Sequence, residues 1–157
     1  MYTNKLYFEG KPVGLKKSPI FQDKEDSFYH LTCKDFKWGS LDREPDLRRS
    51  ERLSWIRPSI ETDHDDACKK SCFKRYVKDY KNKQRIHLLD IEDRYILILE
   101  ERPTYYMLIT AFYIDYDNQL EKKIKEYETY KQQETPWKIQ DVSDISFNNM
   151  VDELFLY

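Results

Sequence analysis

The sequence predicts an α+β fold in one domain. Helices in the N-terminal half would pack on a small antiparallel sheet of about four strands, and a further helix would follow toward the C-terminus. The sheet is predicted by three apolar runs between residues 85 and 116, separated by short polar breaks. That pattern is typical of an antiparallel meander. The helices are predicted by stretches on either side whose apolar residues recur every three to four positions.

The three runs cover residues 86–89, 95–99 and 105–114. The middle run, YILIL, is apolar at every position, so we expect both faces of the sheet to be covered there. The third run carries one hydroxyl, Thr110, within LITAFYI. A small polar group in a buried strand is either satisfied by the structure or part of a site, and the sequence leaves both open.

Residues 1–27 read as an irregular arm, because glycine and proline recur along them. Residues 28–32, FYHLT, read as a short strand. A helix is expected over residues 45–56, with Pro45 in its first turn and Pro58 as its stop. Arg48, Arg49 and Arg52 share a broad face of it, either as a solvated surface beside acids or as a binding surface.

A second helix is expected over residues 65–80, with a basic face that includes Lys74 and Lys78. Its basic character continues through Lys81, Lys83 and Arg85, which makes this segment the best candidate for a phosphate-facing surface. A third helix is expected over residues 119–133. Residues 134–157 are acidic, and an amphipathic helix over 143–155 would close the core or dock on a partner, with core closure favoured.

Composition limits the classes of function. The net charge is −2, so only a local basic patch could attract a polyanion. The mean hydropathy is −0.89, and no apolar run approaches the length of a membrane span. We expect no signal peptide and no membrane partner. With three cysteines and no secretory signal, reduced thiols and a cytoplasmic location are the simplest interpretation.

Nucleotide-binding and serine-hydrolase motifs are absent from the sequence. His64, Cys68 and Cys72 stand four residues apart on the second predicted helix. One straight helix does not wrap a tetrahedral ion over that length, so we interpret them as a core stripe rather than a zinc site. No metal and no other cofactor are expected.

His30 has the side chain best suited to proton transfer near neutral pH. The chain also offers an arginine cluster, a strand threonine and several tyrosines. Cleavage of RNA without a metal needs such a set: proton-transfer groups for the 2'-OH and the 5'-oxygen, and cations for the phosphoryl oxygens. Trp55 or Tyr113 could stack an unpaired base.

Several segments together resemble one nuclease family. They are FYHLTCKDF, RRSERLSWIRP, RIHLLD, YILILEER and YYMLITAFYID, followed by a helix rich in lysine and glutamate. This order is similar to the phage-associated branch of the barnase–EndoU–colicin–RelE (BECR) superfamily of toxin-like ribonucleases. The resemblance covers roughly residues 30 to 130. Its most specific parts are the string ending in Trp-Ile-Arg-Pro and the strand LITAFY.

The resemblance implies N-terminal helices on a four-stranded antiparallel sheet. It also implies a metal-independent endoribonuclease that leaves a 2',3'-cyclic phosphate on single-stranded or looped RNA, such as tRNA or mRNA. His30 would be the acid or base, Arg49 and Arg52 would stabilise the phosphorane, and Thr110 would bind the scissile phosphate beside Tyr113. The remaining RNA-binding residues would be Trp55, Arg57, Lys74 and Lys78. A protein inhibitor or antitoxin would be a further partner.

The sequence thus divides into an arm (1–27), a nuclease-like core (28–133) and an acidic segment (134–157) within a single domain. The alternative function is a non-catalytic phage accessory or inhibitor module, whose arginines bind an acidic protein surface or a nucleic acid. Cleavage of RNA in EDTA separates the two hypotheses.

Overall fold

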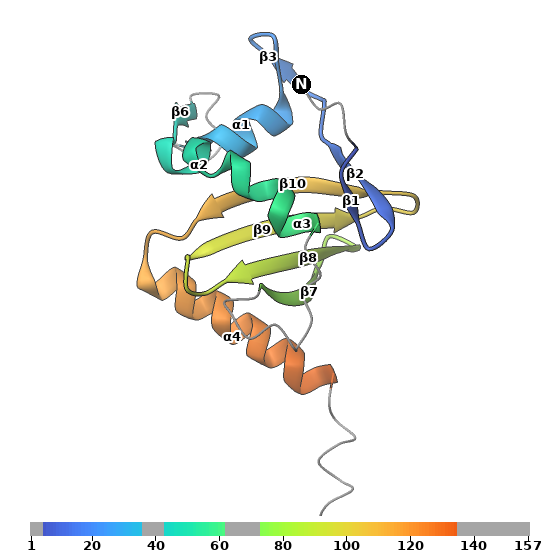
Figure 1. Cartoon of the computed structure of the whole chain (residues 1–157), viewed down its shortest axis with the longest axis vertical. Helices are drawn as coiled ribbons and strands as arrows, with labels where there is room; N and C mark the ends of the chain where they lie inside the picture. The colour runs from blue at the N-terminus through green and yellow to red at the C-terminus, as the bar shows by residue number, and fades with distance from the viewer. Residues whose placement is uncertain (1–4, 36–42, 62–72, 135–157) are drawn as a thin grey trace, which may run out of the picture.

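A six-stranded mixed sheet forms the centre of the molecule (Figure 1). The computed structural model describes residues 5–35, 43–61 and 73–134. The strand order is β1-β2-β10-β9-β8-β7. The strands are β1 (Tyr7–Phe8), β2 (Lys11–Leu15), β7 (Lys74–Tyr80), β8 (Lys83–Asp90), β9 (Tyr95–Glu101) and β10 (Tyr106–Tyr113). The α+β class is confirmed, but the sheet has two N-terminal strands beyond the four expected.

The predicted meander is confirmed as β8, β9 and β10, which pair antiparallel. Residues 96–99 of β9 are buried on both sides, as the YILIL run predicts. Leu97 and Leu99 join one apolar cluster, whereas Ile96 and Ile98 join another on the opposite face. This alternation follows from the two-residue period of a strand.

The predicted helix over residues 65–80 is wrong from residue 74 onward, because β7 occupies Lys74–Tyr80 and pairs with β8. Lys81 and Asn82 connect the two strands, and both have positive φ (47° and 61°). Two-residue hairpin turns of this kind match the twist of antiparallel strands. The apolar spacing around Tyr76 fits a helix as well as a strand. The two-residue turn at Lys81 and Asn82 favours the strand, because it lets this segment pair with β8. Residues 62–72 lie outside the described part of the chain.

The irregular arm is also a wrong prediction, because residues 5–25 include four short strands. Glu9 and Gly10 make the turn between β1 and β2, with φ of 46° and 77°. β2 then pairs parallel with the start of β10. The other two strands, β3 (Ile20–Phe21) and β4 (Lys24–Glu25), form a separate hairpin. Pairing between β2 and β10 joins segments far apart in sequence, which local patterns cannot reveal.

The strand predicted at residues 28–32 is a helix, α1 (Asp26–Thr32). Asp26 lies in its first turn, and its carboxylate is 3.3 Å from the imidazole of His30, one turn later. The Thr32 hydroxyl donates to the Phe28 carbonyl at 2.7 Å. Leu31 packs on the apolar cluster of the sheet. These one-turn contacts and the packing of Leu31 outweigh the strand preference of the aromatic residues.

The helix expected over residues 45–56 is divided into α2 (Leu47–Glu51), a 3₁₀ turn (Leu53–Trp55) and α3 (Ile56–Glu61). Asp46 caps α2 by accepting from the amides of Arg48 and Arg49. Pro58 lies in the first turn of α3, where proline is tolerated, and so does not end the helix. Before α2, β5 (Cys33–Asp35) pairs with β6 (Arg43–Pro45).

The C-terminal helix is confirmed as α4 (Asp117–Glu134). Leu120, Ile124 and Tyr127 pack on the cluster that contains Ile96, whereas Ile56 and Ile60 of α3 pack on the cluster of the other face. The sheet is therefore covered on both sides (Figure 1). The predicted helix at 143–155 lies outside the described residues. None of the described helices combines the length and apolar character needed to cross a membrane.

Candidate functional site

Three of the five predicted catalytic residues meet near β10, but through contacts that the sequence does not predict. The main-chain carbonyl of His30 accepts a hydrogen bond from the Thr110 hydroxyl at 3.1 Å and another from the Arg49 guanidinium at 3.0 Å. These residues therefore lie side by side. The Arg49 guanidinium and the Thr110 hydroxyl, which are predicted to donate to a phosphate, donate instead to the backbone of α1 and fix that helix on β10.

Four arginines gather at the far end of β10. We call Arg48, Arg49, Arg52 and Arg94 the arginine cluster. The guanidinium carbons of Arg48, Arg52 and Arg94 lie 5.2, 4.7 and 6.0 Å from the centre of the Tyr113 ring, and that of Arg49 lies 5.1 Å from the Phe112 ring. These are cation–π distances. The cluster therefore holds the end of the sheet together.

The arginine cluster also has polar partners. Arg48 pairs with Asp115, and Arg94 donates to Asp117 at 2.7 Å and to the carbonyl of Ile114 at 2.9 Å. Arg52 donates to the carbonyl of Arg48 at 2.9 Å. Because each arginine has such contacts, the cluster mainly holds α2, β10 and the start of α4 together.

Thr110 and Tyr113 stay on opposite faces of β10. The register shifts between Leu108 and Thr110 and is regular from Thr110 to Tyr113. The bulge precedes Thr110, so it does not turn the two side chains toward one face. A shared phosphate site for Thr110 and Tyr113 is not formed by this strand.

Two of the predicted RNA-binding residues are built into the structure. Trp55 is half-buried, and its ring meets Tyr95 edge to face with centres 5.4 Å apart. Arg52 lies over the same indole at 5.2 Å. Arg57 pairs with Glu61 one turn along α3. Trp55 is therefore a core anchor, and it is not presented as a free stacking platform.

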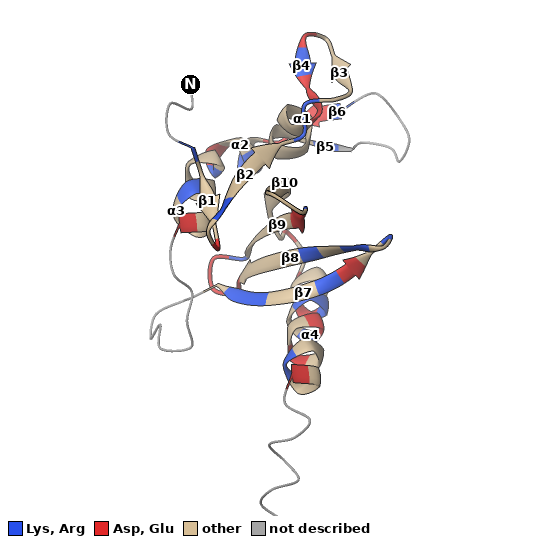
Figure 2. Cartoon of the chain, turned by 90° about the vertical axis from the view of Figure 1, so that its right-hand side faces the viewer, with Lys and Arg blue, Asp and Glu red and all other residues tan. Residues whose placement is uncertain are grey.

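A basic hollow lies at the opposite end of the sheet. This basic pocket has a volume of about 420 Å³, and five lysines and arginines line it together with one glutamate. His30 lines it as well. Figure 2 shows Lys and Arg along β7 and β8. The lining residues are Lys16, His30, Tyr80, Lys81, Lys83, Arg85, Glu100, Arg102, Met107 and Ile109.

Glu100 organises the cations of the basic pocket. Its side chain is only 5% exposed and lies 2.6 Å from Arg102, 3.2 Å from Arg85 and 3.5 Å from Lys83. A single carboxylate cannot neutralise three cations, so the group retains positive charge. The Nε atom of Arg102 is buried without a hydrogen-bond partner in the described structure. An anion that entered the pocket would meet these donors already held in place.

His30 enters the pocket from α1 with a carboxylate behind it. Its Nε2 is 3.3 Å from Asp26, and Lys16 is 2.8 Å from the same carboxylate oxygen. Asp26 is buried, at 6% exposure. A carboxylate behind an imidazole orients the ring. The side chain of His30 therefore lies in the basic pocket, whereas its carbonyl contacts Arg49 and Thr110.

Tyr80 and His87 extend the same face of the sheet. The guanidinium carbon of Arg85 is 3.6 Å from the centre of the Tyr80 ring. His87 stacks on Tyr76, and burial together with Lys123, Lys78 and Arg85 lowers the pKa of His87 to about 4. His87 is therefore neutral at physiological pH.

Sequence reasoning missed most residues of the basic pocket. It identified a basic segment that continues through Lys81, Lys83 and Arg85 as phosphate-facing, but it placed the part of this segment before residue 81 on a helix. The strand pairing brings Arg85 opposite Glu100, and this partner cannot be read from spacing. The predicted Lys78 does not line the pocket and pairs with Glu126, and Lys74 is half-buried on the same strand.

No group of metal-ligating side chains exists among the residues that the structure describes. His64, Cys68 and Cys72 lie outside that part of the chain.

Comparison of the chain with protein-family models, curated proteins and solved structures finds no match. The interpretation of the site depends on its own geometry.

Proposed function

We propose that the protein is a metal-independent endoribonuclease that acts on single-stranded or looped RNA and leaves a 2',3'-cyclic phosphate. The observation that carries the proposal is the presence of His30 in a pocket with five lysines and arginines. The cations would hold the scissile phosphate and stabilise the charge that develops on it. The resemblance of the sequence to the BECR nucleases implies the same activity.

The reaction places two demands on the pocket. A group must take the proton of the 2'-OH as that oxygen attacks phosphorus, and a proton must reach the 5'-oxygen as its bond to phosphorus breaks. His30 is suited to either step near neutral pH. Lys83, Arg85 and Arg102 would contact the phosphoryl oxygens, with Glu100 as the residue that keeps them together.

Arg49, Arg52, Thr110 and Tyr113 take a different part in this proposal. Arg49 and Thr110 hold the His30 carbonyl and thereby the position of its imidazole. Arg52 and Tyr113 fasten the segment that carries Arg49. They are positioning residues, and their direct contact with phosphate stays a prediction from the sequence.

The test uses the full chain with tRNA and rRNA in EDTA. The proposal expects discrete fragments with 2',3'-cyclic phosphate ends, and it expects His30→Ala to abolish them. RNA that stays intact at a large excess of protein contradicts the enzyme. Retained RNA binding without cleavage supports instead a nucleic-acid-binding module, which the cations of the pocket also favour.

A further inference from the structure

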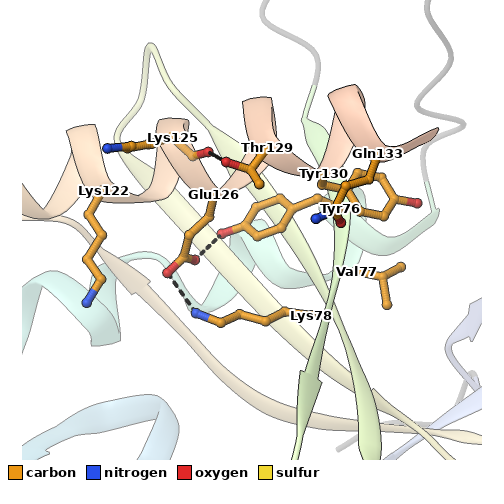
Figure 3. A pocket seen from close by; sticks show the side chains of 9 residues that line it. All are labelled: Tyr76, Val77, Lys78, Lys122, Lys125, Glu126, Thr129, Tyr130 and Gln133. Atoms are coloured by element: carbon orange, nitrogen blue, oxygen red, sulfur yellow. Dashed lines mark hydrogen bonds and ion pairs between the residues drawn. The ribbon is translucent and has the colours of Figure 1, made fainter. Parts of the chain in front are cut away.

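A second hollow lies between α4 and the strand β7, and it shares no lining residue with the basic pocket. Figure 3 shows this groove, which has a volume of about 300 Å³. The strand contributes Tyr76, Val77 and Lys78, and the helix contributes Lys122, Lys125 and Tyr130. We call it the β7 groove.

The β7 groove follows the edge of the sheet. Tyr76, Val77 and Lys78 are consecutive, and side chains alternate between the faces of a strand. A hollow that contacts all three must therefore run along the strand's edge. Among the described strands β7 pairs only with β8. Within the described part of the chain, the peptide N–H and C=O groups of its other edge have no strand partner and could pair with a further strand.

The charge of the groove favours an acidic ligand. Glu126 already has its partners, because it accepts from the Tyr76 hydroxyl at 3.1 Å, from Lys78 at 2.8 Å and from Lys123 at 3.1 Å. Burial raises the pKa of Glu126, but the hydrogen bonds from Lys78 and Lys123 outweigh this and lower it to about 2. Lys122 and Lys125 make no ion pair with any described residue. Two cations thus border the edge without an ion-pair partner among the described residues.

We propose that the β7 groove binds an extended, acidic segment of another protein, which adds to β7 as a new edge strand. Main-chain hydrogen bonds to the edge would provide affinity, and alternate side chains would provide selectivity. Side chains on the α4 side would be Asp or Glu, facing Lys122 and Lys125. Those on the other side would be apolar, next to Val77, which packs on the core cluster of that face.

A protein strand suits this groove better than RNA does. The exposed edge offers peptide donors and acceptors at strand spacing, which a peptide can match along its length. The Tyr76 hydroxyl is engaged with Glu126, and the ring is buried, so it is not presented for base stacking. The proposal uses neither His30 nor the basic pocket, and it stands or falls independently of RNA cleavage.

The experiment uses the full chain labelled with ¹⁵N and a capped peptide of about eight residues with alternating Asp and Val, a length matched to one strand. We expect amide shifts confined to β7 and α4. The double variant Lys122→Glu/Lys125→Glu should weaken binding about tenfold or more, because it reverses the charge that faces the acids. Lys5→Glu/Lys17→Glu, at two exposed lysines outside both hollows, is the matched control and should leave peptide affinity unchanged.

Several outcomes overturn the proposal. If a peptide with Lys in place of Asp binds equally well, the groove does not select acidic side chains. An RNA oligonucleotide that produces the same β7 and α4 shifts identifies a nucleic-acid subsite instead. Shifts of residues 135–157 in the double variant without peptide would identify the chain's own acidic segment as the occupant. Failure of both peptides to bind leaves the groove without the proposed role.

Discussion

The two ends of β10 both gather cations, yet they differ in what surrounds them. In the arginine cluster the guanidinium groups lie on the rings of Phe112 and Tyr113 and donate to carbonyls and aspartates. In the basic pocket three cations share the single buried carboxylate Glu100 and line a hollow of about 420 Å³. The first arrangement fastens helices to the sheet, and the second leaves positive charge around a space.

The comparison shows that the number of cations does not identify a binding surface. A cationic side chain can bind a ligand when its protein partners leave part of its charge unneutralised and some of its N–H donors unpaired. Tertiary contacts determine how much remains. His30 connects the two regions, because its carbonyl belongs to the fastening and its imidazole belongs to the pocket. Substitutions in the arginine cluster and in the basic pocket therefore separate effects on folding from effects on RNA binding and cleavage.

The largest expected effect is the loss of RNA cleavage in His30→Ala, by roughly 10²–10⁴-fold. The substitution removes the imidazole but keeps the carbonyl that Arg49 and Thr110 hold. Folding should therefore be nearly unchanged. Initial rates on a labelled oligonucleotide in EDTA measure the effect, with thermal unfolding as the check on the fold. Cleavage at the wild-type rate would remove His30 from the site but not the activity.

The next effect is a loss of folding stability on acidification, caused by the protonation of His87, which lies near the cations of the basic pocket. Burial, with Lys123, Lys78 and Arg85, lowers the pKa of His87 to about 4 from 6.5. Between these values the unfolded chain binds a proton that the folded chain does not, so stability falls as pH drops from 6.5 to 4. At about 1.4 kcal/mol per pKa unit, this difference corresponds to about 3 kcal/mol.

Urea unfolding at a series of pH values measures this contribution, and His87→Phe should remove it while keeping an aromatic ring against Tyr76. Arg85→Ala should raise the pKa of His87, because it removes a nearby positive charge. Arg48→Ala, at the other end of β10, should leave that pKa unchanged. Equal responses to both variants would contradict the distinction between the two regions.

A smaller effect is expected for Thr110→Val, which keeps the shape of the side chain but removes the hydrogen bond to the His30 carbonyl. The carbonyl keeps the Arg49 donor, so the loss of stability should be about 1 kcal/mol. Urea unfolding measures it, and cleavage should fall only as far as the His30 ring becomes less well positioned. Unchanged stability together with a large loss of cleavage would instead place Thr110 on the scissile phosphate, as the sequence predicts.

Part of this site follows from sequence patterns, and part does not. The meander and α4 are predicted because YILIL and the stripe of Leu120, Ile124 and Tyr127 have local periodicity. His30 is identified by its chemistry, although its helix reads as a strand. Glu100 and Lys16 are not identified, because their roles depend on pairing with distant segments. Arg49 is identified as a neighbour of His30, but spacing does not reveal that it donates to the His30 carbonyl.

The smallest expected effect compares Arg85→Ala with Arg48→Ala in RNA binding. Arg85 belongs to the basic pocket, so its removal should weaken RNA binding several-fold and reduce the slope of log K against log salt by roughly 0.7, the value for one phosphate contact on a single strand. Arg48 is occupied with Asp115 and Tyr113, so its removal should leave the slope unchanged. Fluorescence anisotropy with a non-cleavable 2'-O-methyl oligonucleotide measures both. A reduced slope for Arg48→Ala alone would return the phosphate to the arginine cluster and reverse the assignment of the two ends of β10.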